Sequence, residues 1–283
     1  MKNVAVIGSS GAIGEAFVKQ YIKDSSISKI YSISRSRIEI TDDRVKHIQM
    51  DIVDEMSVEN AAKAIQEKHL DHIIIATGIL HTSTFGPEKS VRDISMNKFV
   101  EVLTVNTVGP ALVGKFFLPL LNNKSKSVMA FLSARVGSIS DNKLGGWYSY
   151  RASKSALNQV IKNFSIEIKR TNSHAVIMGL QPGTVKSKLS EPFQKNVKEG
   201  NLISAEESVT KLIKVIEECS SAKSGSLLSW DGSIIKPSLR AKKTQRMAGL
   251  LNNLKDYVPC DSVTAACHII KPNRILLTKS AKL

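Results

Sequence analysis

The stretch Lys2-Asn3-Val4-Ala5-Val6-Ile7-Gly8-Ser9-Ser10-Gly11-Ala12-Ile13-Gly14-Glu15, close to the start of the chain, decides the fold. Its apolar run at residues 4–7 is typical of a strand buried on both faces, and a helix-compatible segment begins at Glu15. A glycine-rich turn between strand and helix lets the backbone approach a pyrophosphate, which then lies on the helix N-terminus. The spacing is Gly-x-x-Gly-x-x-Gly rather than the more familiar Gly-x-Gly-x-x-Gly. Its place after the first predicted strand favours dinucleotide binding over an ordinary tight turn.

Strand-like and helix-like segments alternate beyond this turn. The further predicted strands cover residues 29–34, 45–50, 72–76, 127–133, 175–180 and 225–230. The predicted helices cover residues 58–68, 97–121, 149–170 and 205–219. Such alternation predicts a parallel sheet covered on both faces. We therefore expect an α/β fold, a Rossmann-like doubly wound sheet of about seven strands.

Composition limits the class of protein. The chain has 283 residues, 42% of them hydrophobic, enough for one large domain with an appendage. Lys115 interrupts the longest apolar run, so no membrane association is expected. Cys219, Cys260 and Cys267 are too few and too poorly spaced for a disulfide framework or a metal site. A cytoplasmic protein is expected; the Ala281-Lys282-Leu283 terminus resembles a peroxisomal address, which matters only in a eukaryote.

The charge is strongly positive. A formal net charge of +15 accompanies basic residues that become denser towards the C-terminus, where only Asp256 and Asp261 oppose them. The alternation of elements also fades there, so the sequence predicts a domain over residues 1–237 and a loosely packed or poorly ordered basic extension over 238–283. Such charge attracts phosphates without specificity. Aromatic residues, only 5%, do not interleave with the basic ones, which argues against nucleic-acid binding.

Tyr150 lies four residues before Lys154 in a predicted helix. Four residues are about one helical turn, so the phenol and the ammonium share a face. A phenol is a poor acid at neutral pH unless a nearby cation favours its ionised form. The pair therefore indicates a general acid/base for a carbonyl or an alcohol. Tyr148 has no such partner, since residue 152 is alanine.

Several motifs together resemble the short-chain dehydrogenase/reductase family over residues 1–237. They are the glycine turn and the segments 133–139 and 146–154, which are closest in kind to the C-factor-type and sniffer-type carbonyl reductases. The resemblance implies catalytic roles for Tyr150 and Lys154 and, for Asn106, the anchoring of a relay water. It also implies cofactor contacts from Gly8, Ser10, Gly11, Ile13, Gly14, Asp51, Ile52, Gly78, Tyr150, Lys154, Pro182, Gly183 and Val185.

The family's catalytic serine is absent. Aligning the chain on Gly137 puts Ala134 at that position. Ser133 or Ser138 could polarise the substrate carbonyl instead, and we take Ser133 as the candidate. Neighbouring strand residues face opposite ways, so Ser133 would need a local bulge.

Cofactor preference follows from the end of the second predicted strand. An NAD-selective site places an acid there, about 20 residues past the glycine turn. Here the segment reads Ile33-Ser34-Arg35-Ser36-Arg37, without an acid. Arg35 and Arg37 could clamp a 2′-phosphate, since arginine prefers bidentate contacts. NADP(H) is therefore expected in preference to NAD(H).

These observations predict an NADP(H)-dependent oxidoreductase, with Tyr150 as general acid/base and a small-molecule carbonyl or alcohol as substrate. A homodimer or homotetramer is expected from the resemblance. The alternative is a cofactor-binding sensor or signalling protein with little turnover, which Ala134 favours. A third reading, nucleic-acid binding through the basic extension, rests on charge alone.

Overall fold

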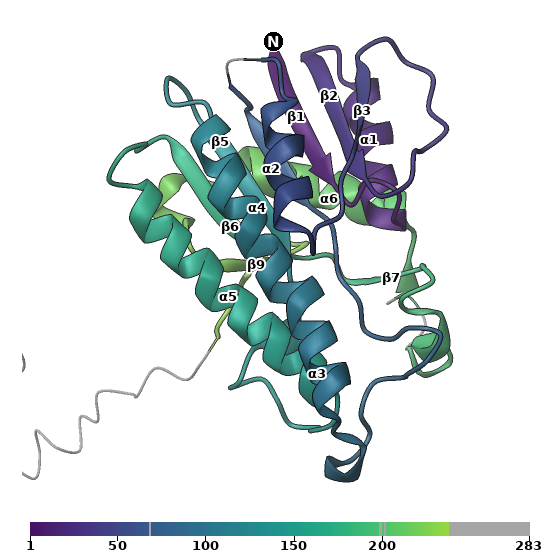
Figure 1. Cartoon of the computed structure of the whole chain (residues 1–283). Helices are drawn as coiled ribbons and strands as arrows, with labels where there is room; N and C mark the ends of the chain where they lie inside the picture. Colours follow the sequence, from purple (N-terminus) through teal and green to yellow (C-terminus); the bar gives the residue numbers. More distant parts are fainter. Residues whose placement is uncertain (68, 198–199, 201, 238–283) are drawn as a thin grey trace, which may run out of the picture. The chain divides into compact units, whose positions relative to one another are not determined.

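The computed structural model describes residues 1–67, 69–197, 200 and 202–237. An eight-stranded sheet forms its centre (Figure 1). From edge to edge, the strands are β10 (Ile234–Ile235), β9 (Leu227–Ser229), β6 (Ala175–Gln181), β5 (Ser127–Leu132), β4 (His72–Ile75), β1 (Lys2–Ile7), β2 (Ile27–Ser34) and β3 (Val45–Gln49). All neighbours pair in parallel except β10 and β9. The predicted α/β class and doubly wound sheet are confirmed, with one strand more than expected because β10 is too short to show a period.

Helices cover both faces of the sheet. Those in the described part of the chain are α1 (Ala12–Lys23), α2 (Glu55–Lys63), α3 (Met96–Leu103), α4 (Gly109–Phe117), α5 (Tyr148–Ile168) and α6 (Ala205–Glu218). Val4 and Val6 of β1 belong to the core that includes α1 and α6, whereas Ala5 and Ile7 belong to the core that includes α2, α4 and α5. This two-sided burial follows from the alternation of side chains along a strand, and it explains the continuous apolar run.

Helix α2 begins three residues earlier than the predicted residue 58, and it ends five residues earlier than predicted. Asp54 precedes the helix, and its carboxylate accepts hydrogen bonds from the N–H groups of Met56 and Ser57 at 3.0 and 3.2 Å. An aspartate in this position satisfies donors that have no partner within the helix. Asp54 marks the start of the helix, which the apolar periodicity alone did not indicate.

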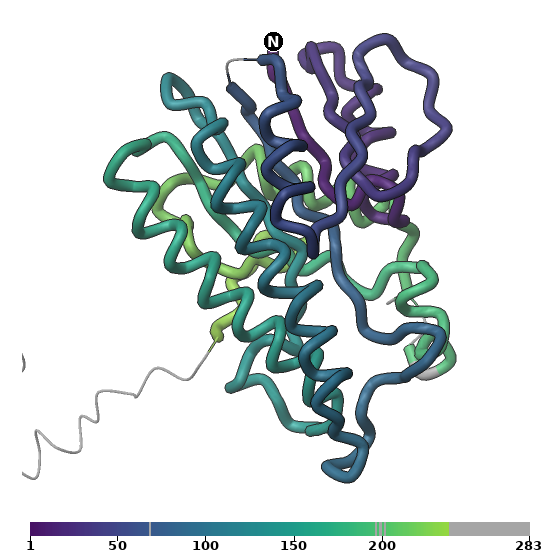
Figure 2. The backbone as a smooth tube through the Cα atoms, in the orientation of Figure 1, coloured from purple at the N-terminus to yellow at the C-terminus, as the bar shows by residue number. Residues whose placement is uncertain are grey.

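The predicted helix over residues 97–121 is a composite. Helix α3 runs through a π-helical turn, Thr104–Val108, into α4, and Figure 2 traces this run beside α5. Pro110 stands in the first turn of α4, where a missing N–H is tolerated. The helical stretch Met96–Leu120 is long and apolar enough to cross a membrane by length and composition alone, and 44% of its most apolar window is buried in the fold.

Shorter elements complete the described fold. β7 (Thr184–Val185) and β8 (Leu202–Ile203) form a separate parallel pair. Short 3-10 helices cover Val91–Asp93, Leu118–Leu120, Arg135–Gly137, Glu191–Asn196 and Ser221–Lys223. The predicted basic extension, residues 238–283, lies outside the described residues.

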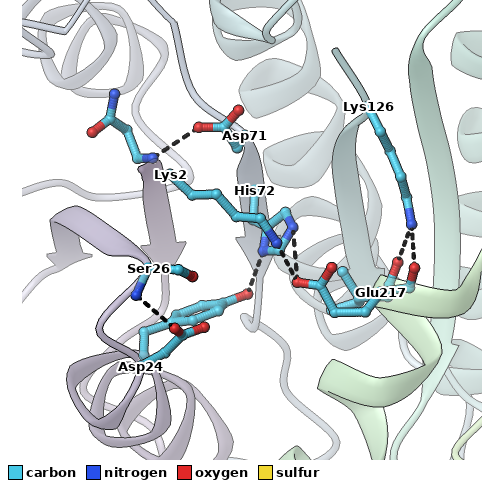
Figure 3. Close-up of polar contacts among 10 residues, drawn as sticks. Lys2, Asp24, Ser26, Asp71, His72, Lys126 and Glu217 are labelled. Atoms are coloured by element: carbon cyan, nitrogen blue, oxygen red, sulfur yellow. Dashed lines mark hydrogen bonds and ion pairs between the residues drawn. The ribbon is translucent and has the colours of Figure 1, made fainter.

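A polar cluster lies at the amino ends of the central strands, the edge opposite the glycine turn (Figure 3). Lys2 of β1 pairs with Glu217 of α6 at 2.6 Å. His72 of β4 lies 3.7 Å from the same carboxylate, and its other ring nitrogen is 3.1 Å from the Tyr21 hydroxyl. Burial lowers the pKa of His72 to about 4, so the ring is neutral at neutral pH.

Candidate active site

The glycine turn has the shape that the sequence predicts. Gly8, directly after β1, has a φ of +82°, and its N–H donates to the carbonyl of Ile33 at 2.8 Å. A Cβ on Gly14 would overlap the Gly8 carbonyl oxygen, so the turn closes only with glycine at that position. Gly11 caps α1 without a side-chain hydrogen bond, so the first N–H groups of the helix have no side-chain partner.

A cavity of about 330 Å³ lies at the carboxyl ends of the central strands. This is the point where the strand order reverses between β1 and β4, the usual ligand position in such sheets. Of the predicted cofactor residues, the cavity is lined by Gly8, Ser10, Gly11, Arg35, Asp51, Ile52 and Gly78. Ile13 instead packs against the core beneath α1.

Two features of this cavity were not anticipated. Thr77 lines it, and its hydroxyl oxygen is buried without a hydrogen-bond partner among the described residues. Glu101 of α3 also lines it. Because Thr77 is the second residue after β4, its position at the carboxyl end of a central strand could have indicated it.

The two arginines after β2 differ in position. Arg35 lines the first cavity and also a neighbouring one of about 580 Å³, whereas Arg37 lines neither. Ser34, just before them, is buried and donates through its hydroxyl to the carbonyl of Ser36 at 2.7 Å. The same hydroxyl accepts from Ser9 at 3.0 Å. The buried serines therefore tie the arginine loop to the glycine turn.

Tyr150 and Lys154 lie on consecutive turns near the start of α5. The Lys154 ammonium is 5.7 Å from the centre of the Tyr150 ring, and it donates to the carbonyl of Leu132 at 2.9 Å. Burial raises the pKa of Tyr150 to about 12 and lowers the pKa of Lys154 to about 8. In this structure burial therefore outweighs any lowering of the phenol pKa by the lysine.

Gly78 links the lysine to Asn106 and to the cavity. A Cβ on Gly78 would lie 3.3 Å from both the Asn106 side-chain oxygen and the Lys154 nitrogen. The Asn106 amide accepts from the N–H of Ile79 and donates to the Ile79 carbonyl, both at 2.8 Å. It also donates to the Ser153 hydroxyl at 3.1 Å. Residues far apart in sequence thus meet around Gly78, which lines the cavity, whereas Asn106, Tyr150 and Lys154 line neither cavity themselves.

Comparison with known proteins identifies the family. The sequence profile described as short chain dehydrogenase matches residues 2–198 of the chain. The chain belongs to the short-chain dehydrogenase family. It is therefore an oxidoreductase by family.

Individual relatives agree with this. The chain is 30% identical over 189 residues, 66% of its length and 78% of the relative's, to 1-hydroxy-2-glutathionyl-2-methyl-3-butene dehydrogenase of a Rhodococcus species. It is 28% identical over 141 residues, half of its length and 80% of the relative's, to C-signal of Myxococcus xanthus. The carbonyl reductase Sniffer of Drosophila melanogaster superposes with a TM-score of 0.73 at 20% identity, covering 83% of this chain and 99% of that one. At that identity the match shows the fold alone.

The candidate serines of this short-chain dehydrogenase are both engaged elsewhere. Ser133 is buried, and its hydroxyl donates to the Asn158 side-chain oxygen at 2.7 Å. The Ser138 hydroxyl donates to the carbonyl of Lys236 at 2.5 Å. Ala134 lies between them in extended backbone, directly before the 3-10 turn that packs on α5. Neither hydroxyl is left without a partner.

The segment after β6 is anchored rather than open to the cavity. Gly183 has a φ of +83°, and the Pro182 carbonyl accepts from the Ser208 hydroxyl of α6 at 2.7 Å. Val185 is buried in β7. None of these three lines either cavity, so a contact with a cofactor stays a prediction.

An aromatic cluster beside Tyr150 was not predicted. The ring of Trp147 lies 6.2 Å from that of Tyr150 and 5.1 Å from that of Phe193, in the 3-10 segment Glu191–Asn196. His81 contacts Phe193 in turn at 6.2 Å. These rings form an apolar wall next to the phenol. Three aromatic residues spread over 112 positions gave no local signal.

Proposed function

We propose that the chain is an NADP(H)-dependent oxidoreductase that reduces a small-molecule carbonyl or oxidises the corresponding alcohol. One observation carries the proposal: Tyr150 lies one turn from Lys154, whose ammonium lies next to Gly78 at the wall of the cavity. The family supplies the general chemistry. The residues around the phenol are the reason for assigning Tyr150 as the proton donor.

The chain's own residues fit a dinucleotide. Gly8 and Gly11 line the cavity without side chains, the first turn of α1 has N–H groups without a side-chain cap, and the Thr77 hydroxyl has no partner among the described residues. These are donors and space that a pyrophosphate and a ribose would satisfy. A nicotinamide dinucleotide supplies the hydride when bound. Arg35, at the cavity, supports NADP(H) because its guanidinium can pair with a 2′-phosphate.

The phenol would act as the proton donor in reduction. With a pKa of about 12, Tyr150 keeps its proton at neutral pH and can give it to a carbonyl oxygen. Lys154, whose pKa is about 8, is mostly charged at pH 7 and would bind the ribose. The Asn106 side chain is already used in hydrogen bonds to Ile79 and Ser153. A relay water would therefore bind the Asn106 main-chain carbonyl. In a regular helix this carbonyl would accept from the N–H of residue 110, but Pro110 has no N–H.

Replacing Tyr150 with phenylalanine tests the function. Reduction should fall by at least about a hundredfold, since general acid catalysis contributes that much, while NADPH affinity stays nearly unchanged. The measurement is NADPH oxidation with a panel of aldehydes and ketones, with affinity from fluorescence titration. Tyr148→Phe is the matched control, because Tyr148 lies two residues earlier in the same helix without a lysine partner. A Tyr150→Phe rate within a few-fold of wild type would remove this residue from the mechanism.

A sensor or signalling role remains the second candidate. It is favoured by Ala134 at the serine position, together with the engaged hydroxyls of Ser133 and Ser138. A wild-type protein that binds NADPH tightly but reduces no member of the panel would support it.

We also propose a homodimer or homotetramer assembled through the helices that bear Asn106 and Tyr150. Val100 of α3, Val108 of the π-helical turn and Ile166 of α5 are 57%, 49% and 49% exposed, so these helices offer apolar side chains to a partner. Light scattering on the purified protein tests this, and a monomeric mass would contradict it.

A further inference from the structure

Glu88 is a fully buried acid that the proposed chemistry does not use. It lies between β4 and α3, in none of the family motifs, and its side chain has no exposed surface. One carboxylate oxygen has no hydrogen-bond partner among the described residues, and the Lys98 ammonium lies 3.6 Å from it. Lys98 is itself almost buried, over the ring of Phe85. Burying such charges costs free energy unless they are paired or hydrogen-bonded, so a buried carboxylate here needs compensating contacts.

The start of α5 lacks a cap of its own. Trp147 occupies the capping position with a φ of 51°, in the left-handed region, and no side chain there caps the helix locally. Tryptophan has no acceptor for the free N–H groups of a first helical turn. Serine, threonine, aspartate or asparagine normally fills this position. The first-turn N–H groups of the helix that bears Tyr150 and Lys154 are therefore not capped by a neighbouring residue in the sequence.

Glu88 supplies the missing acceptors from 61 positions away. Its main-chain carbonyl accepts from the N–H of Trp147 at 2.6 Å, and its second carboxylate oxygen accepts from the N–H of Ser149 at 3.3 Å. Gly146 permits this approach, because a Cβ there would lie 3.3 Å from the Glu88 carbonyl oxygen. A negative charge at a helix N-terminus is also favoured by the helix dipole.

We propose that Glu88 is a positioning residue that caps α5 and thereby holds the Tyr150 phenol in place. Tyr150 directly follows Ser149 in the capped turn, and its ring rests against Trp147, the other residue that Glu88 holds. Lys154 lies one turn further on and is held separately by the Leu132 carbonyl. Loss of the cap should therefore displace the phenol but leave the lysine and the cavity in place. This inference rests on the proposed role of Tyr150.

Two double variants separate capping from general stability. Glu88→Gln with Lys98→Met keeps the acceptor oxygen and removes both charges, so no unpaired charge stays buried. Glu88→Ala with Lys98→Met removes the acceptor as well. We expect the alanine double variant to lose about tenfold to a hundredfold in kcat, the scale of a displacement near 1 Å, with NADPH affinity unchanged. The glutamine double variant should stay within a few-fold of wild type.

Asn172→Ala is the stability control. Asn172 is buried just beyond the other end of α5, where its side chain donates to the Asn122 carbonyl and accepts from the N–H of His174. Its loss should lower Tm without lowering kcat. The proposal is overturned if the alanine double variant keeps its kcat, or if the glutamine double variant falls equally far.

Hydrogen exchange gives a readout that needs no turnover. In the alanine double variant, the peptide covering residues 147–153 should exchange about tenfold faster than in the glutamine one, since local opening controls exchange. The peptide covering residues 160–168 should not change. If wild-type protein reduces no substrate, the proposed function fails, and the exchange comparison still decides whether Glu88 orders the first turn. Equal exchange in both double variants would overturn the inference.

Discussion

At the scale of single residues, the proposed proton donor, Tyr150, is a weak acid. Burial keeps the pKa of Tyr150 at about 12, and the lysine beside it is itself shifted downward, to about 8. Such a phenol donates a proton readily only when the carbonyl oxygen already carries negative charge. Other hydrogen-bond donors normally stabilise that charge as it develops. Ala134 cannot donate, so this site lacks the hydroxyl that the family alignment places there.

Restoring the hydroxyl should raise activity. We expect Ala134→Ser to increase kcat roughly tenfold to a hundredfold, since one such donor is worth about two to three decades in well-formed sites. Steady-state NADPH oxidation with the best substrate of the panel measures it. Ser138→Ala is the control and should change kcat by less than a few-fold, because its hydroxyl already donates to the Lys236 carbonyl. A hundredfold loss in Ser133→Ala would instead make Ser133 the donor, despite its bond to Asn158.

At the scale of elements, the loop after β2 positions the arginine that we propose selects the cofactor. Its conformation depends on hydrogen bonds that link Ser32, Ser9 and Ser34 beneath the glycine turn. Ser34 then fixes the carbonyl of Ser36. Arg35, between these two positions, is thereby directed to the cavity edge, whereas Arg37 lines neither cavity. The sequence treated the two arginines as equivalent.

The two arginines should therefore differ in their effect. Arg35→Ala should weaken NADPH binding by one to two decades, because a hydrogen bond to a charged group is worth about 1.5–3 kcal/mol. NADH binding should change little, since NADH lacks the 2′-phosphate. Arg37→Ala is the matched control and should affect neither cofactor strongly. Fluorescence titration of both cofactors measures this, and equal losses for NADPH and NADH in Arg35→Ala would exclude the phosphate contact.

At the scale of the whole molecule, the two ends of the strands have different roles. The carboxyl ends of the strands form the cavity, while the amino ends hold the polar cluster of Lys2, Tyr21, His72 and Glu217 (Figure 3). That cluster joins the first and fourth strands to the first and last α-helices of the described fold. It therefore ties the start of the domain to its C-terminal helix.

The cluster should make the domain sensitive to acid. The pKa of His72 is about 4 when folded, below the 6.5 of an unperturbed histidine, because burial disfavours the charged ring. Between these values the unfolded chain binds the extra proton, so stability falls as the pH drops from about 6.5 to about 4. Tm across this window should fall less steeply in His72→Gln than in wild type. His174→Gln, at an exposed position, is the control; an unchanged slope in His72→Gln would contradict the assignment.

Sequence patterns were reliable where neighbouring residues decide the outcome. The apolar run before Gly8 and the glycine spacing predicted the first strand and its turn. The four-residue spacing of Tyr150 and Lys154 put them on one face of a helix. Helix ends were less well predicted, as Asp54 and α2 show, because a cap depends on a single residue outside the periodic pattern.

The sequence by itself determined the order of strands and helices, the family, and the residues proposed for the chemistry. Only the tertiary structure decided that Glu88 caps α5. It also decided that Trp147 and Phe193 pack together beside the phenol, and that Arg35 rather than Arg37 lines the cavity. Periodicity and turn formation depend on residues within a few positions of each other, so a local stretch of sequence predicts them. Glu88 and Ser149 lie 61 positions apart, and no local pattern links them; their contact exists only because packing of the whole sheet brings their segments together.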